Sequence, residues 1–198
     1  MGYKKSEASV AQIVEAATRV LARQGYARTS LLDIATEAGM SKGALHYHFP
    51  TKDALITKVL DRACDRVADR ARGVWNIAGD PIDALRAALR ELWQVRVEPN
   101  DEAAVVADLL AQSLHDASLR PQLARYYKVA AAQVVEYLQP RLEELGLQPR
   151  LPLDILPRIL NGLLDGLVMQ TIVDPEALDA TRVVESLEIL AAYMFEPI

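Results

Sequence analysis

The chain has 198 residues, of which 51% are hydrophobic and 25% charged, and its formal net charge is −5. A chain of this composition can bury a sizeable core, which argues against wholesale disorder. The single cysteine, Cys64, excludes an internal disulfide framework and a cysteine-rich zinc site, and we expect it to be a small buried residue. The longest uncharged run near the C-terminus, residues 166–173, is too short for a membrane span, which needs roughly 18 residues. Because no signal peptide is apparent, we expect a soluble, cytoplasmic protein.

The charges are unevenly distributed along the chain. Residues 1–52 hold seven Lys or Arg against four Asp or Glu, whereas residues 53–198 hold 15 basic residues against 23 acidic ones. A basic N-terminal segment followed by an acidic remainder of the chain is typical of a protein with one local surface that contacts phosphates. The negative net charge of the chain therefore does not exclude a nucleic-acid partner. Chance clustering in a short segment is the alternative.

Nearly every segment shows apolar residues at helical spacing, and no run alternates apolar and polar residues for long enough to predict a strand. We therefore predict an all-α fold of about nine helices. They cover, approximately, residues 10–24, 31–38, 42–49, 52–77, 82–97, 101–114, 121–140, 154–173 and 179–195. The seventh helix should kink or stop near Pro140, because proline lacks the amide hydrogen that a helix interior requires. Residues 145–149 are predicted to form a loop.

Side chains that can cap a helix stand before several of the predicted starts. They are Ser6 or Ser9 for the first helix, Thr29 or Ser30 for the second, Ser41 for the third and Thr51 for the fourth. Gly25 should end the first helix, and Gly39 should make the turn between the second and the third.

The middle of the fourth predicted helix alternates in charge. Arg62 stands three residues before Asp65, and Arg66 stands three residues before Asp69. Side chains at this spacing are neighbours on a helix surface, so the pattern predicts a solvated, mutually screened face and not a binding stripe.

Residues 25–55 contain a short helix, a glycine turn and a second short helix, which is the layout of a helix-turn-helix. The second of these helices carries small, basic and aromatic residues where a buried helix would carry Leu and Ile. Gly43 and Ala44 leave its outer face nearly bare, so the backbone could approach base edges, while Leu45 and Phe49 face inward. The alternative is a short exposed helix with incidental aromatic residues. We rank DNA binding above it, because an idle surface helix would more typically carry Glu, Lys and Ala.

Three predicted helix starts within this segment offer phosphate sites, because a helix N-terminus presents unpaired N–H groups and a partial positive charge. Each supplies a hydroxyl, and two supply a lysine: Thr29 and Ser30, Ser41 and Lys42, and Thr51 and Lys52. Tyr47 and His48 are placed to reach phosphates or bases.

The segment resembles the DNA-binding domain of TetR/AcrR-type bacterial transcriptional regulators. The resemblance rests on Ser-Lys-Gly-Ala-Leu at residues 41–45, the aromatic cluster that closes in Phe49, and Pro-Thr-Lys-Asp-Ala-Leu at residues 50–55. It implies DNA contacts from Thr29, Ser30, Lys42, Gly43, Ala44, Tyr47, His48 and Lys52, to which we add Ser41 at the cap and His46. His46 is a departure, because the family usually has tyrosine at that position.

The C-terminal half is similar to a subgroup of that family that includes the choline-pathway repressor. The similarity rests on Gly-Leu-Leu-Asp-Gly-Leu at residues 162–167 and Val-Asp-Pro-Glu-Ala-Leu at residues 173–178. It implies a helical architecture for this half but no particular ligand. We accordingly divide the chain into a helix-turn-helix DNA-binding domain, residues 1–52, and a helical effector-binding and dimerisation domain, residues 53–198.

The last two predicted helices are too apolar for the surface of a monomer. We predict that they form a four-helix bundle with a second copy of the chain. The predicted interface residues are Leu156, Leu160, Leu163, Leu167, Val184, Leu187, Leu190 and Met194. Gly162 and Gly166, about one turn apart, would permit a close helix approach. The alternative is that both helices are buried within one subunit.

An effector pocket is expected among the fourth to eighth helices, where the family encloses its ligand. Asn161 and Asp165 share a face of an otherwise apolar helix and could line this pocket, although a hydrogen-bonded pair at the interface explains them equally well. Met169 lies near this pair in the sequence and is a candidate as well. The further candidates, each of which also has a plain core interpretation, are Trp75, Trp93, Gln112, Tyr126, Tyr127 and Tyr137. Their apolar and aromatic character suggests a hydrophobic or aromatic effector.

No catalytic motif is apparent in the sequence. His46 and His48 are two residues apart and point to different helix faces, so they do not form a metal pair, and no phosphate loop, dinucleotide motif or serine elbow is present. We therefore expect no enzyme, cofactor or metal. The expected function is a ligand-responsive regulator, a repressor that binds a palindromic operator as a homodimer. A helix-turn-helix scaffold that has lost its ligand response is the alternative.

Overall fold

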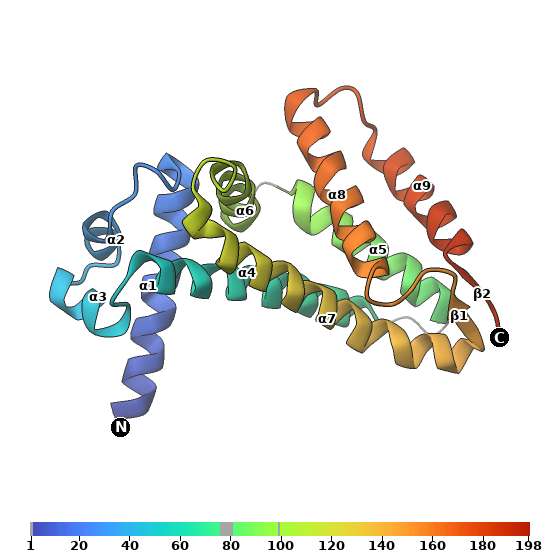
Figure 1. Ribbon diagram of the computed structural model, residues 1–198, viewed down its shortest axis with the longest axis horizontal. Coiled ribbons are helices and arrows are strands. Elements are labelled where there is room, and N and C mark those ends of the chain that lie inside the picture. The colour runs from blue at the N-terminus through green and yellow to red at the C-terminus, as the bar shows by residue number, and fades with distance from the viewer. Residues whose placement is uncertain (1, 76–80, 99) are drawn as a thin grey trace. The chain divides into compact units, whose positions relative to one another are not determined.

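The computed structural model describes residues 2–75, 81–98 and 100–198, without the side chains of residues 2–6, 74, 75, 81, 82, 84, 85 and 191. Within this part of the chain lie nine α-helices, one 3-10 helix and two short strands (Figure 1). The chain divides into two compact units. Residues 1–64 and 100–126 make up the first, which we call the head unit, and residues 65–99 and 127–198 make up the second, the body unit.

The head unit holds α1 (Gly2–Gln24), α2 (Leu31–Glu37), α3 (Lys42–His48), the start of α4 (Lys52–Trp75), α6 (Asp101–Gln112), the 3-10 helix Ala117–Leu119 and the start of α7 (Arg120–Leu145). All of these helices contribute to one apolar core, in which Ile13, Ile34, Leu45, Leu55 and Leu109 are fully buried. Burial of side chains of this size contributes roughly 1.5–3 kcal/mol each. This packing stabilises α2 and α3, which at seven residues each would not persist as isolated helices.

The predicted caps around the helix-turn-helix are confirmed. Ser30 and Asp33 form a capping box, in which Ser30 Oγ accepts from Asp33 N at 3.2 Å and Asp33 Oδ2 accepts from Ser30 N at 2.8 Å. Ser41 Oγ accepts from the N–H group of Ala44 at 3.1 Å at the start of α3. Gly25 has φ +77° and Gly39 has φ +64°, a left-handed conformation that glycine adopts without steric cost, so both turns lie where the sequence predicts them.

The first helix is longer than predicted. It begins at Gly2, so Ser6 and Ser9 lie inside α1 and do not cap it. No glycine or proline interrupts residues 3–24, so nothing in this stretch stops the helix from extending toward the N-terminus.

The alternating charges of α4 do more than screen one another. In the head unit, Arg62 Nε lies 3.7 Å from Glu102 Oε1, and Asp61 accepts from Arg125 at 2.8 Å. In the body unit, Arg70 contacts Glu91 at 2.8 Å and Glu98 at 2.6 Å. The predicted solvated face is therefore corrected, because these charges link α4 to α5, α6 and α7.

The body unit holds α5 (Pro81–Val97), α8 (Leu156–Val173), α9 (Ala180–Tyr193) and the C-terminal parts of α4 and α7. One core cluster contains Trp93, Leu164, Val183 and Leu187. A second contains Leu138, Leu142, Leu156 and Phe195. Among the described residues, no helix is both long and apolar enough to cross a membrane.

Two short strands in the body unit correct the prediction that the chain has none. Strand β1 (Leu147–Pro149) pairs antiparallel with β2 (Phe195–Pro197), with Gln148 opposite Glu196. Three residues are too few for an alternating pattern to be recognised. The helix α7 also runs through Pro140 to Leu145 instead of stopping there, and the exposed position of Pro140 allows the loss of one helical hydrogen bond to be met by solvent.

Candidate nucleic-acid interface and ligand site

The outer face of α3 is exposed and carries small side chains. Leu45 at 0% exposure and Phe49 at 6% anchor this helix to the head core. The residues opposite this anchor, Ser41, Lys42, Gly43, Ala44 and Tyr47, are exposed, and Ser30 at the start of α2 is exposed too. His46 and His48 are half-buried, and the ring of His48 makes an edge contact with that of Tyr47, with centroids 5.1 Å apart. The structure thus presents a narrow helix whose backbone is accessible, as a major-groove reader requires.

Two of the predicted DNA contacts point into the head unit. Thr29 is buried, and its hydroxyl donates to Gly25 O at 2.7 Å. Lys52 Nζ donates to Tyr26 O at 2.6 Å and lies 3.6 Å from the centroid of the Tyr26 ring. Partial burial lowers the pKa of Lys52. In this structure both side chains hold the loop before α2, and their contact with DNA stays a prediction.

The helix α6 clamps the same loop. Asp108 Oδ2 accepts from the backbone N–H group of Tyr26 at 2.6 Å, and a Cβ at Gly25 would lie 3.4 Å from the same oxygen. This contact is not predictable from the sequence, because Asp108 is 82 residues from Tyr26 and belongs to no motif.

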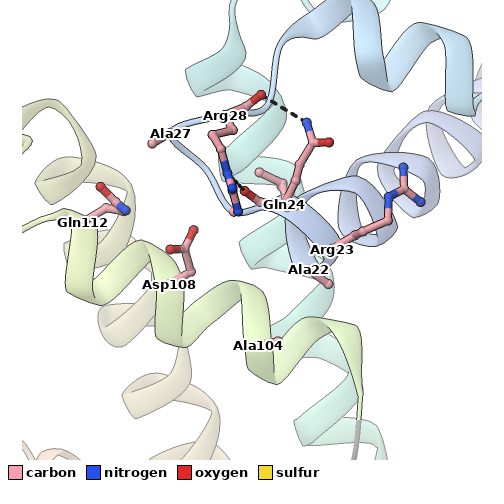
Figure 2. Close-up of a pocket in the computed structure, with 10 residues that line it drawn as sticks. Ala22, Arg23, Gln24, Ala27, Arg28, Ala104, Asp108 and Gln112 are labelled. Atoms are coloured by element: carbon pink, nitrogen blue, oxygen red, sulfur yellow. Dashed lines mark hydrogen bonds between the residues drawn. The ribbon is translucent and has the colours of Figure 1, made fainter.

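Beside this clamp is an open hollow of about 290 Å³ in the head unit. Figure 2 shows its polar lining, where Gln24 and Arg28 exchange hydrogen bonds with each other's backbone carbonyl at 3.1 and 2.9 Å. Gln112, which was predicted for the effector pocket, lies on the wall of this hollow.

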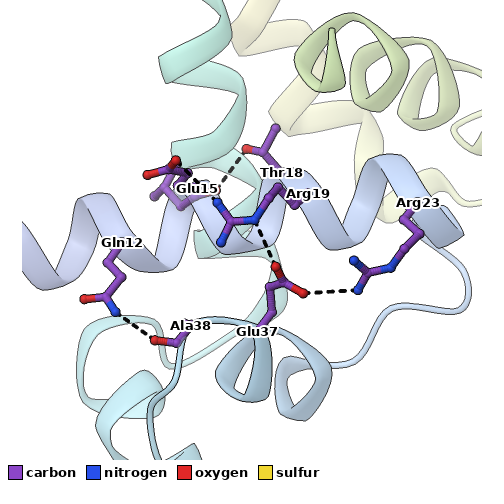
Figure 3. A network of polar contacts seen from close by, with 8 residues as sticks. Gln12, Glu15, Thr18, Arg19, Arg23, Glu37 and Ala38 are labelled. Carbon is purple, nitrogen blue, oxygen red and sulfur yellow. Dashed lines mark hydrogen bonds and ion pairs between the residues drawn. The ribbon is translucent and has the colours of Figure 1, made fainter.

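A polar network fixes α2 on α1 (Figure 3). Gln12 donates to the carbonyl of Ala38 at 2.8 Å, and Glu37 accepts from Arg19 at 2.9 Å and from Arg23 at 3.2 Å. The hydrogen bond from Arg19, followed by that from Arg23, lowers the pKa of Glu37. Two of the seven basic residues in residues 1–52, Arg19 and Arg23, are therefore paired with a carboxylate, and they hold α2 against α1.

A second constellation lies in the body unit around Arg96 of α5. Its guanidinium donates to Asp165 Oδ1 at 3.1 Å and to Asn161 Oδ1 at 2.9 Å. The other carboxylate oxygen of Asp165 accepts from the hydroxyl of Tyr127 at 3.0 Å. Trp93, one turn before Arg96, is 2% exposed. We call these five residues the polar cluster.

The polar cluster brings together four of the predicted pocket residues, namely Trp93, Tyr127, Asn161 and Asp165. Gln112 and Tyr126 belong to the head unit, where Tyr126 packs against the core. Met169 is 44% exposed, and the side chain of Trp75 lies outside the described residues. Arg96 was missed, although an arginine within the apolar run of residues 92–97 is the signal that could have identified it.

The predicted interface on α8 and α9 is only partly a surface. Leu156 and Leu187 are buried inside the chain, which corrects their assignment to a partner contact. Leu160 and Met194 pack against the cluster that contains Phe195, and Leu163, Leu167 and Val184 pack against the cluster that contains Trp93. Of the predicted set, Leu190 is exposed.

A different apolar face of these two helices is exposed, and we call it the outer face. Its large side chains are Ile155, Ile159, Met169, Ile172, Val173, Ile189, Leu190 and Tyr193. On α8 they follow one stripe with Gly162 and Gly166, which are also exposed. The predicted interface residues lie mostly on the inner stripe. Both stripes are apolar, and periodicity alone does not say which one packs against the core of its own chain.

Two family models match the chain. One, described as bacterial regulatory proteins of the tetR family, covers residues 13–59, and the other, described as BetI-type transcriptional repressor, C-terminal, covers residues 81–195. An uncharacterised HTH-type transcriptional regulator of Bacillus subtilis (strain 168), YfiR, is 24% identical over 89% of this chain and 86% of its own length.

Solved structures show the same fold. A transcriptional regulator from Rhodococcus sp. Rha1 has a TM-score of 0.71 at 24% identity and covers 93% of this chain and 95% of its own. FadR from Bacillus subtilis, solved in complex with stearoyl-CoA, has a TM-score of 0.71 at 17% identity, over 90% of this chain and 95% of its own.

The helix-turn-helix, the family model that matches it and the similarity to a known HTH-type regulator together define a DNA-binding transcriptional regulator. The chain belongs to the TetR family of bacterial transcriptional regulators, with a C-terminal part of the BetI type, and this confirms the resemblance noted in the sequence. These matches place it in a family of regulators and not in a family of enzymes.

Proposed function

We propose that this protein is a repressor that binds a palindromic operator as a homodimer in the cytoplasm and leaves it when a small apolar effector binds. The observation that carries the proposal is the exposed face of α3, where Gly43 and Ala44 leave the backbone open between Lys42 and Tyr47. Lys42 and the helix start at Ser41 supply phosphate contacts, and Tyr47, at 82% exposure, is free to reach a base or a phosphate.

The dimer part of the proposal is supported by the outer face of α8 and α9. A β-carbon added to Gly162 or Gly166 would meet nothing within 4 Å in the chain itself. Glycine inside a helix costs roughly 1 kcal/mol relative to alanine, so two glycines that their own chain does not require indicate close approach by another helix. A second copy that presents the same face would cover Ile159, Met169 and Tyr193 on both chains. Two reading helices would then be held about 34 Å apart, one turn of DNA.

The effector part rests on the body unit and on α4. Residues 52–64 of this helix belong to the head unit and residues 65–75 to the body unit, so α4 is continuous between the two. An effector that binds one conformer of the body unit more tightly shifts the population toward that conformer. We propose that the favoured conformer displaces α4 and thereby separates the two reading helices from successive major grooves. FadR from Bacillus subtilis, which shares this fold, was solved with stearoyl-CoA, a ligand that carries a long apolar chain.

The test is a gel shift on DNA upstream of the protein's own gene, repeated across salt concentrations. We expect sequence-selective binding whose affinity falls steeply with salt, because lysine contacts release counterions from phosphates. A variant with Lys42→Ala should bind every DNA sequence more weakly. Lys58 is an exposed lysine on α4, and the matched control Lys58→Ala should leave DNA affinity nearly unchanged. Binding that does not distinguish the upstream DNA from a scrambled fragment would contradict the proposal.

A further inference from the structure

Three buried nitrogen donors in the described part of the body unit have no hydrogen-bond acceptor. One is Nε of Arg72 on α4. The other two lie on α5 and α8: Nε1 of Trp93, a residue that is 2% exposed, and Nδ2 of Asn161, a residue that is 6% exposed. Buried donors are nearly always paired, and an unpaired one carries the full cost of its lost hydration. Each of these groups would be satisfied by an oxygen acceptor.

The orientation of the Asn161 amide is fixed by its neighbour. Its Oδ1 accepts from Arg96 Nη2 at 2.9 Å, and a flipped amide would place two donors against each other. The NH₂ group is therefore the end of this side chain that has no acceptor. Trp93 lies one turn before Arg96 on α5, and it shares a core cluster with Leu164, which is three residues after Asn161 on α8.

The charges of the polar cluster are already balanced. Arg96 pairs with Asp165, and the second oxygen of Asp165 is occupied by the hydroxyl of Tyr127. A carboxylate ligand would bring an uncompensated negative charge beside this pair. An amine would add further donors, although the N–H groups of Trp93 and Asn161 already lack acceptors. These two N–H groups would be satisfied by an uncharged group with an oxygen that accepts hydrogen bonds.

The surroundings of the polar cluster are apolar. Leu92, Val97, Leu163, Leu167 and Val168 are partly buried and pack against the cluster that contains Trp93. The side chain of Asp165 is 31% exposed, so the polar cluster reaches the surface of the body unit at that residue. A ligand that meets these conditions has an apolar body and a neutral carbonyl group.

We propose that Trp93 and Asn161 are the anchor of the effector site and that the effector is an uncharged carbonyl compound, held by hydrogen bonds from Nε1 of Trp93 and Nδ2 of Asn161 to its carbonyl oxygen. This inference rests on the proposed function in that it assigns the effector to the body unit, and it names the effector's chemical class.

The experiment measures binding of matched probes to the full chain by thermal shift and by titration of tryptophan fluorescence. On a naphthalene scaffold the probes are 2-acetylnaphthalene, 2-ethylnaphthalene and 2-naphthoate, and on a linear scaffold they are 2-decanone, decane and decanoate. We expect the ketone of at least one scaffold to bind about tenfold or more tightly than its hydrocarbon and its carboxylate, as one to two buried hydrogen bonds imply.

Two variants remove the donors. Trp93→Phe keeps an aromatic ring, and Asn161→Leu keeps a side chain of similar size without adding a negative charge beside Asp165; circular dichroism would verify that both variants fold. Each should abolish the preference for the ketone over the hydrocarbon. Leu187→Ala, in the same core cluster, lowers stability without removing a donor and should keep that preference.

The proposal is overturned if neither ketone binds, if the carboxylate binds as tightly as the ketone, or if the ketone preference persists in either variant. The gel shift described above reports separately on DNA binding. If the ketone preference depends on Trp93 and Asn161 but no operator is bound, the assignment of the effector anchor holds and the proposed repressor function fails. If an operator is bound but the ketone preference is absent, the assignment of the anchor fails and the proposed repressor function holds.

Discussion

The clamp between α6 and the loop before α2 gives a prediction whose size follows from the structure. Asp108→Ala removes the acceptor of the Tyr26 N–H group, a contact of 2.6 Å in partly buried surroundings. A backbone donor left unpaired in such a place costs about 1–3 kcal/mol. The free energy of unfolding should fall by that amount in urea titrations that follow helix content by circular dichroism.

The loop that this clamp holds also positions Ser30 at the start of α2, so operator affinity should fall together with stability. Asp108→Asn keeps an oxygen that can accept from the same N–H group and should therefore lose less. Gln112→Ala, one turn further along the same hollow, is the matched control and should change the free energy of unfolding by less than about 0.5 kcal/mol. If Asp108→Ala were as stable as this control, the clamp would contribute nothing to the fold and the reasoning would be refuted.

Three further predictions concern other surfaces of the chain. Tyr47→Ala changes a side chain that is 82% exposed, so it should leave the melting temperature nearly unchanged but weaken operator binding in gel shifts; unaltered affinity would count against a DNA role for this residue. Ile159→Glu places a charge on the outer face and should convert a dimer into a monomer in analytical ultracentrifugation, whereas Glu136→Gln, an exposed position on α7, should not. Glu37 has a pKa below its ordinary value of 4.5, so its stabilising effect is present above that pH and is lost as the pH falls through the folded-state pKa. Glu37→Gln should accordingly flatten the loss of stability on acidification in melting curves, and an unchanged pH profile would show that the pairs with Arg19 and Arg23 contribute nothing.

Much of the local structure of the head unit could be predicted from the sequence, because it depends on residues that are close together in the chain. The caps Ser30 and Ser41, the turn glycines and the short helix between Ser41 and Phe49 are each specified by neighbours within a few residues, and the structure places them as predicted. What the sequence did not reveal depends on distant partners. The pairing of β1 with β2 joins residues about 50 apart, and no pattern within three residues predicts it.

The same reason explains the partial success with the candidate ligand site. Trp93 and Asn161 stood out as an aromatic and a polar side chain in apolar helices, but Arg96, which connects α5 to α8, did not. Likewise, α8 carries two apolar stripes, and only the packing of Leu156 and Leu164 into cores of the body unit separates the inner stripe from the outer one. Sequence periodicity identifies that a helix has apolar faces, whereas tertiary contacts decide which face remains exposed.

The assignment of residues 100–126 to the head unit has a consequence for protein engineering. A chimaera that exchanges only residues 1–52 between two such regulators would combine the loop around residue 26 of one protein with α6 of the other. Asp108 would then lie against a loop from a different protein, and its hydrogen bond to the backbone at residue 26 could be lost. Grafts of new operator specificity onto this scaffold should carry α6 along with the reading helix, although about a quarter of the chain separates the two in the sequence.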